Sequence, residues 1–173
     1  MKPLLRGSVS ALGCLLGAAI IIVAVPVPHA AEPATISYSG DLAKLARLAP
    51  YPAVAPRSLP ASWRPVSSGL AVGGANGAGT VTWQLGFMTR DGTLASLEES
   101  NASAAAFIRR MTNSGTTLPP VRLDGQAWSP VSTTSRDQRS MYLVSAGFTV
   151  VVTGNATWAE LRELAASLRP LSR

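Results

Sequence analysis

Carboxylates are the residues whose types and spacing come nearest to an active site. Glu98 and Glu99 are adjacent, and Asp91 and Asp124 each precede a glycine. Two carboxyl groups about 5–10 Å apart can hydrolyse a glycosidic bond, one as the acid and the other as base or nucleophile. Adjacent residues of a strand point to opposite faces, so Glu98 and Glu99 are not expected to converge. We interpret them as charges at the end of a strand, before a helix.

Histidine, cysteine and lysine, which serve as nucleophiles, bases or metal ligands, are scarce. The chain has one cysteine, Cys14, and one histidine, His29, and the only lysine after Lys2 is Lys44. A Ser-His-Asp triad and a zinc site both need side chains that the region beyond His29 lacks. We therefore expect no metal, no cofactor and no catalytic residue, and hence a protein that is not an enzyme.

Aromatic, glycine-rich and asparagine-containing segments have structural interpretations. Residues 73–79, GGANGAG, lack the Lys-Ser/Thr ending of a phosphate-binding loop, so we interpret them as a hairpin linker. Asn101 and Asn155 each begin an Asn-X-Ser/Thr sequence, which we interpret as the start of a helix. The tryptophans could line a sugar or peptide groove, but such residues more often pack in a core or at its rim. They are Trp63, Trp83, Trp128 and Trp158.

Positive charge is spread along the chain. The formal net charge is +6, and Lys2 and Arg6 contribute two of these charges, which leaves +4 for the rest. Nucleic-acid-binding proteins usually gather basic residues on one face, whereas the only basic doublet here is Arg109–Arg110. We expect no nucleic-acid partner.

The N-terminal segment predicts a membrane anchor. Residues 7–28 contain no charged side chain, and about 20 apolar residues span a bilayer as a helix. Lys2 and Arg6 precede the segment, and the positive-inside rule keeps that end in the cytoplasm. Residues 1–29 are therefore expected to be a cytoplasmic stub and transmembrane helix, with the rest of this single-pass protein outside the cell membrane.

Two other interpretations of this segment remain open. Cleavage as a signal peptide after Ala30 or Ala31 would release a secreted protein, but Pro28 and His29 fit poorly at the −3 position. A lipoprotein signal would end at Cys14, yet the strongest apolar run follows that residue. We favour retention of the segment as an anchor.

The remaining chain predicts a linker, 30–40, and one α+β domain, 41–173, with a mainly antiparallel sheet and two or three helices. Asp41 is expected to cap a helix to Ala49, and the proline-rich stretch 50–65 to be extended and irregular. Thr157 and Glu160 form a capping box at the start of the last helix. Strands are expected at 63–72, 80–89, 94–99, 121–123, 127–133, 141–145 and 148–153, and a further helix from Ser100 or Asn101 to Thr112.

The order and spacing of several short stretches resemble a known family. The stretches are 59–63, 85–87 with 91–92, 98–101, 123–125 with Trp128, 147–154 and 161–168. Together they are similar to the actinobacterial membrane-anchored proteins of domain-of-unknown-function family 4245. The resemblance implies an N-terminal anchor and an outer domain, and it implies no catalytic residue. The closing strand-Gly-Asn-helix segment is also similar to sensor domains of bacterial membrane anti-sigma proteins.

These observations favour a non-enzymatic, membrane-tethered binding or accessory domain of the cell envelope, whose partner is an envelope protein or a lipid or wall ligand. The first alternative is an extracytoplasmic sensor related to anti-sigma regulators. The second is an envelope enzyme that uses Glu98, Glu99, Asp91 or Asp124. An apolar groove between sheet and helices would favour a small apolar ligand, whereas a filled interior would favour protein–protein contact.

Overall fold

The computed structural model describes residues 33–73, 79–133 and 137–171. Within these ranges no helix is both long and apolar enough to cross a bilayer. The segment 7–28, with Cys14, and the neighbouring His29 lie outside the described residues, as do 74–78 of the glycine-rich linker. The elements are α1 (Ser39–Leu48), β1 (Val54–Pro56), β2 (Arg64–Val72), β3 (Val81–Met88), β4 (Leu94–Ser100), α2 (Ala104–Met111), β5 (Thr116–Thr117), β6 (Val121–Leu123), β7 (Gln126–Ser132), β8 (Arg139–Ser145), β9 (Phe148–Gly154), α3 (Trp158–Ser167) and β10 (Leu168–Pro170).

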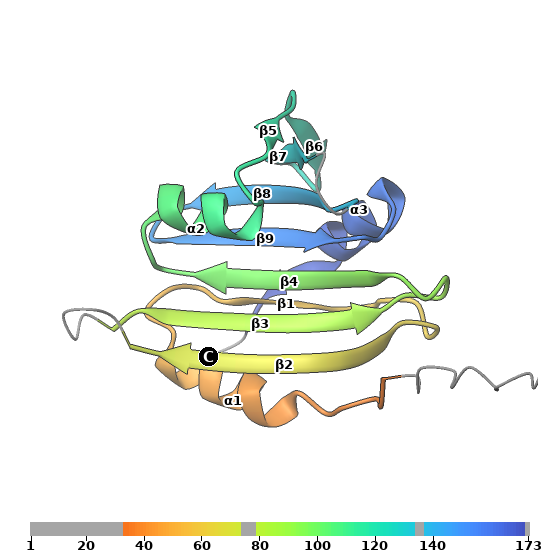
Figure 1. Cartoon of the computed structure of the whole chain (residues 1–173). Coiled ribbons are helices and arrows are strands. Elements are labelled where there is room, and N and C mark those ends of the chain that lie inside the picture. The colour runs from red at the N-terminus through yellow and green to blue at the C-terminus, as the bar shows by residue number, and fades with distance from the viewer. Residues whose placement is uncertain (1–32, 74–78, 134–136, 172–173) are drawn as a thin grey trace, which may run out of the picture. The chain divides into compact units, whose positions relative to one another are not determined.

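An eight-stranded sheet is the framework of the domain. Its strand order is β2-β3-β4-β9-β8-β7-β5, and β6 also pairs with β7. Every pair is antiparallel. Helix α2 lies over β8 and β9 on one face, while α3 and β1 pass behind the sheet on the other (Figure 1). The predicted α+β class, with a mainly antiparallel sheet, is confirmed.

Tight turns set the register of the hairpins. Asp124 and Gly125 join β6 to β7 with positive φ angles of 46° and 79°, the conformation that short hairpin turns require. Gly92, in the turn from β3 to β4, has φ 74°, and Gly147, in the turn from β8 to β9, has φ 85°. The Asp-Gly and Ala-Gly sequences therefore mark the hairpins that they predict.

The core lies between the sheet and the layer formed by α1, α3 and β1. Alternate side chains of β3 face this layer, and Trp83, at their centre, is completely buried. Leu45 of α1 and Leu164 of α3 are equally buried and belong to the same cluster. Trp128 of β7 is 3% exposed. The prediction that Trp83 and Trp128 are core residues is confirmed.

The start of α3 is predicted correctly, whereas the starts of the other helices are not. Thr157 and Glu160 form the expected capping box, in which each side chain accepts the other's backbone N–H. Helix α1 has its N-cap at Tyr38 instead of Asp41, whose carboxylate accepts a hydrogen bond from a serine of β2. Helix α2 begins at Ala104, because Ser100 is still paired within the sheet.

A two-stranded ribbon of β1 and β10 corrects the expectation for 50–65. Val54–Pro56 pairs antiparallel with Leu168–Pro170. The N–H of Leu171 donates to the carbonyl of Ala53 at 2.8 Å and extends the pairing at one end. Each strand has three residues and ends in a proline, which has no N–H to donate, so neither segment carries a local strand signal. Residues 116–117, which form β5, were likewise not predicted.

The close approach of β9 to the first residue of β4 gives a stability prediction. Gly154 has φ 152°, and a Cβ on it would lie 2.0 Å from the carbonyl oxygen of Leu94. We expect Gly154→Ala to lower the free energy of unfolding by about 2 kcal/mol or more, since the backbone must shift. Gly69→Ala is the matched control, because no atom lies within 4 Å of its Cβ position. Urea denaturation of the full chain measures both, and equal stabilities would contradict the prediction.

Candidate functional site

An apolar groove opens between the core face of the sheet and the ribbon of β1 and β10. Its volume is about 380 Å³, at the lower end of the range of small-molecule pockets, roughly 300–1,000 Å³. Apolar side chains form most of its wall: Pro52, Val54, Leu123, Trp128, Leu143, Phe148, Val150, Ala165, Leu168 and Pro170. The polar residues of the wall are Asp124, Gln126, Ser145 and Arg169.

The sheet supplies one wall of the groove and the ribbon supplies the facing one. Leu143 of β8 and Val150 of β9 are directly paired, so their side chains lie together on the core face. Phe148 stacks on Tyr51 with ring centroids 4.9 Å apart, which fixes the chain just before β1 against the sheet. The groove is thus built from segments that lie more than a hundred residues apart in the sequence, β1 and β10 among them.

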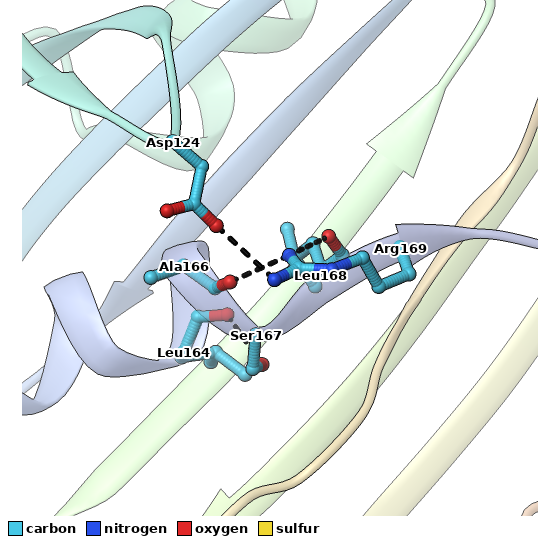
Figure 2. Close-up of polar contacts among 6 residues, drawn as sticks. All are labelled: Asp124, Leu164, Ala166, Ser167, Leu168 and Arg169. Atoms are coloured by element: carbon cyan, nitrogen blue, oxygen red, sulfur yellow. Dashed lines mark hydrogen bonds and ion pairs between the residues drawn. The ribbon is translucent and has the colours of Figure 1, made fainter.

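An ion pair crosses the rim of the groove. Arg169 Nη2 lies 3.2 Å from Asp124 Oδ2, and the two side chains are 52% and 60% exposed. Nη1 of the same guanidinium donates to the carbonyls of Ala166 and Leu168, each at 2.7 Å. Figure 2 shows this arrangement, with the arginine held at the end of α3 and Asp124 reaching across from the β6–β7 turn. An exposed pair of this kind contributes only about 0–1 kcal/mol to stability.

A shallow basin lined mainly by charged and hydroxyl-bearing residues adjoins the groove and shares Arg169 with it. We call this surface the basin, and it is formed by Arg57, Ser58, Glu163, Ala166, Ser167 and Arg169. Arg57 follows β1, and its N–H donates to the carbonyl of Ser167 at 2.9 Å. The same ribbon therefore carries the apolar wall and brings two arginines to the surface beside it.

Glu99 points into the core beside the groove and is completely buried. Its Oε2 accepts a hydrogen bond from the N–H of Val54 at 3.0 Å, and Oε1 has no hydrogen-bond partner within the described part of the chain. Burial raises the pKa of Glu99 to about 8, although the hydrogen bond from Val54 opposes the rise. The carboxyl is therefore mainly protonated at neutral pH. Burial and the nearby Glu99 also raise the pKa of the Tyr51 hydroxyl.

Glu98 lies on the opposite face of the sheet, where it is 7% exposed. Burial raises its pKa to about 7, and the charge of Arg110 on α2 opposes the rise. The prediction that Glu98 and Glu99 face opposite ways is confirmed, because Glu99 pairs with the core residue Val150 and Glu98 with its neighbour. Both lie near the end of β4, as interpreted, but both are buried, so the interpretation of them as solvated charges is wrong. Their divergence keeps them from acting on one substrate.

The other polar candidates have separate places. Asp91 is exposed in the β3–β4 turn, and Lys44 is exposed on α1. Asn101 and Asn155 do not start helices; each side-chain oxygen accepts the N–H of the first residue of a strand, at 2.7 and 2.6 Å. Among the described residues, no group of three His, Cys, Asp or Glu side chains is placed to hold a metal ion.

The tryptophans divide between core and rim. Trp63 is 8% exposed and packs in the core, and Trp158 is partly buried against it. Trp128 is the tryptophan that lines the groove. Arg169 was missed at the sequence level, since nothing near it in the sequence indicates that its partner is Asp124.

The raised pKa values of the glutamates give a stability profile against pH. The ordinary glutamate pKa is 4.5, so between this value and about 8 the folded chain keeps a proton on Glu99 that the unfolded chain releases. The contribution of Glu99 to stability is therefore greatest below the ordinary pKa and falls as pH rises towards 8, and Glu98 adds to this fall up to about 7.

Glu99→Gln removes the larger of these contributions. We expect the loss of stability between pH 5 and 8 to shrink by at least about 1 kcal/mol in the variant. Urea denaturation at several pH values measures the difference, with the exposed Glu163→Gln as control. Parallel profiles for Glu99→Gln and the unaltered chain would contradict the expectation.

Comparison with known proteins places the chain in a family. No curated protein matches it. The complex structure of Pseudomonas aeruginosa MucA/MucB is similar at 12% sequence identity and a TM-score of 0.37, covering 69% of this chain and 35% of that chain. The chain thus spans about a third of that one, and a likeness of this degree decides neither fold nor function. A family model described as protein of unknown function (DUF4245) matches residues 5–168. The chain therefore belongs to this family, as the order of its short motifs predicts.

Proposed function

We propose that this chain is a non-enzymatic binding module of the cell envelope, whose groove takes a small apolar ligand. The observation that carries the proposal is the groove itself, about 380 Å³ of space between two walls of mainly apolar side chains. Water in such a space makes few hydrogen bonds with its surroundings. A ligand that replaces it gains roughly 25 cal/mol for each Å² of apolar surface removed from water.

The position of the groove supports binding rather than catalysis. Its polar residues lie at the rim, and the buried acid nearest to it, Glu99, is engaged with the N–H of Val54. Glu98 faces away on the other side of the sheet. The carboxyls of Glu98 and Glu99 therefore cannot flank the same bond of a substrate. An envelope enzyme that uses this pair is the less favoured function.

The uncharged segment 7–28 supports placement at the outer face of the membrane. Its length is that of a bilayer-spanning helix, and Lys2 and Arg6 precede it. In that placement the domain is tethered to a source of apolar molecules. A retained anchor accordingly has a functional reason, since ligand would reach the domain from the bilayer or from envelope components beside it.

Blocking the groove tests the proposal. The full chain is reconstituted in phosphatidylcholine vesicles with dodecanol that carries a photoactivatable diazirine at its chain end. We expect labelling of β8, β9 and β10 at residues that line the groove. Leu143→Trp places a larger side chain there, and a clash of about 1–3 kcal/mol weakens binding about 5- to 150-fold.

Val144→Trp is the matched control, because Val144 is the next residue on β8, is 54% exposed and does not line the groove. It should keep the labelling of the unaltered chain. Mass spectrometry of the labelled peptides locates the probe. Labelling confined to residues 7–28, or equal loss in both variants, would overturn the proposal.

A further inference from the structure

Arg169 lines both the groove and the basin, which carries two further charged residues, Arg57 and Glu163. A molecule in the groove that reaches towards the basin would therefore lie beside this arginine. From this arrangement we infer that the groove binds a single-chain amphiphile with an anionic oxygen head group, which takes the place of Asp124 beside Arg169. The inference rests on the proposed function, because it names the chemistry of the ligand in that groove.

The guanidinium of Arg169 is held ready for an anion. Nη1 donates to the carbonyls of Ala166 and Leu168 at 2.7 Å, so the side chain is fixed at the end of α3 before any ligand binds. Nη2 points to Asp124 at 3.2 Å and is the donor that a head group would engage. Arginine keeps its charge at all physiological pH values and suits planar oxygen anions such as carboxylate and phosphate. Fixing it beforehand lowers the entropy lost on binding.

Asp124 is the group that can leave. Its side chain is 60% exposed, and it sits in the turn between β6 and β7, so it returns to water at little cost. The pair it makes with Arg169 is a surface pair and contributes about 0–1 kcal/mol. An incoming anion that also buries an apolar chain therefore outcompetes it.

The surrounding charge favours an anion over a cation. The basin holds two arginines, Arg57 and Arg169, against one carboxylate, Glu163. Without Lys2 and Arg6, which the proposed anchor keeps on the cytoplasmic side, the chain has a formal net charge of +4. Glu98 and Glu99 are buried and add less negative charge to the surface than the formal count implies. Long-range attraction thus acts in the same direction as the local charges.

The apolar end of the ligand has a matching path. Leu143 and Val150 lie side by side on the sheet wall, and Leu168 faces the groove from β10, the residue before Arg169. A single alkyl chain along these side chains would bring its head group to the guanidinium. The groove volume of about 380 Å³ suits one short chain better than the two long chains of a phospholipid.

Matched photoactivatable probes test the inference on the full chain in phosphatidylcholine vesicles. The probes are dodecyl phosphate, dodecanol and dodecyltrimethylammonium, each with a diazirine at the chain end. In the unaltered chain we expect groove residues to be labelled by dodecyl phosphate at the lowest concentration and by the ammonium at the highest. Arg169→Gln should raise the half-saturating concentration of dodecyl phosphate about tenfold or more, the value of one charge-assisted hydrogen bond.

Asp124→Asn distinguishes a site for an anionic head group from an ion pair that only maintains the shape of the groove. It removes the competing carboxylate, so dodecyl phosphate should label the groove at lower concentration, the opposite of the effect of Arg169→Gln. If the ion pair served only to hold the groove in shape, both variants would change labelling in the same direction. Arg162→Gln, an exposed arginine of α3 outside groove and basin, is the control and should leave labelling unchanged.

The outcomes distinguish failure of the anionic head group from failure of the proposed apolar binding site. Equal labelling by all three probes, with no effect of Arg169→Gln, would overturn the anionic head group while leaving the apolar binding site intact. Preferred labelling by the ammonium would also overturn it. Failure of every probe to label the groove would remove the proposed function as well.

Discussion

The hydrogen bond from the N–H of Val54 to the carboxyl of Glu99 is the contact on which the groove depends. Strand β1 has three residues and lies apart from the ladder of the main sheet, and this bond links it to a buried side chain of β4. A charged carboxylate would be costly at this depth, and the raised pKa means that the acid is mainly neutral. Within residues 33–73, 79–133 and 137–171 one oxygen, Oε1, has no hydrogen-bond partner, which is a cost that an apolar residue would not incur. The buried hydrogen bond thus holds the ribbon over the sheet, and the space beside it is the groove.

The interactions that hold the walls of the groove are strong, whereas the ion pair at its rim is weak. The walls consist of side chains such as Trp128 and Val150, whose burial gives shape and resists change. At the rim, the ion pair of Asp124 and Arg169 is exposed and contributes little to stability. A site that must admit and release a ligand needs this combination, because a preformed cavity lowers the cost of binding and an exchangeable rim contact allows entry. The opposite face of the sheet, covered at β8 and β9 by α2, takes no part in the groove.

Local signals in the sequence predict the hairpins and the last helix but miss the ribbon. The Asp-Gly turns and the capping box of Thr157 and Glu160 depend on interactions between residues at most four positions apart. Such local interactions can be predicted from the sequence. The pairing of β1 with β10 joins residues 54–56 to 168–170 and includes prolines that argue against strands. The candidate site likewise depends on contacts between distant segments. Asp124 was singled out as a carboxylate, but its partner and the groove arise only when distant segments meet.

A direct measurement of where an alkyl chain lies tests the central claim. The full chain, with 13C-labelled leucine and valine methyl groups, is placed in nanodiscs of deuterated lipid and mixed with protonated dodecyl phosphate. The account predicts nuclear Overhauser effects from the alkyl protons to methyl groups of the groove, above all Leu123, Leu143, Val150 and Leu168. Effects confined to exposed methyl groups outside the groove, such as those of Val72 and Val144, would contradict it.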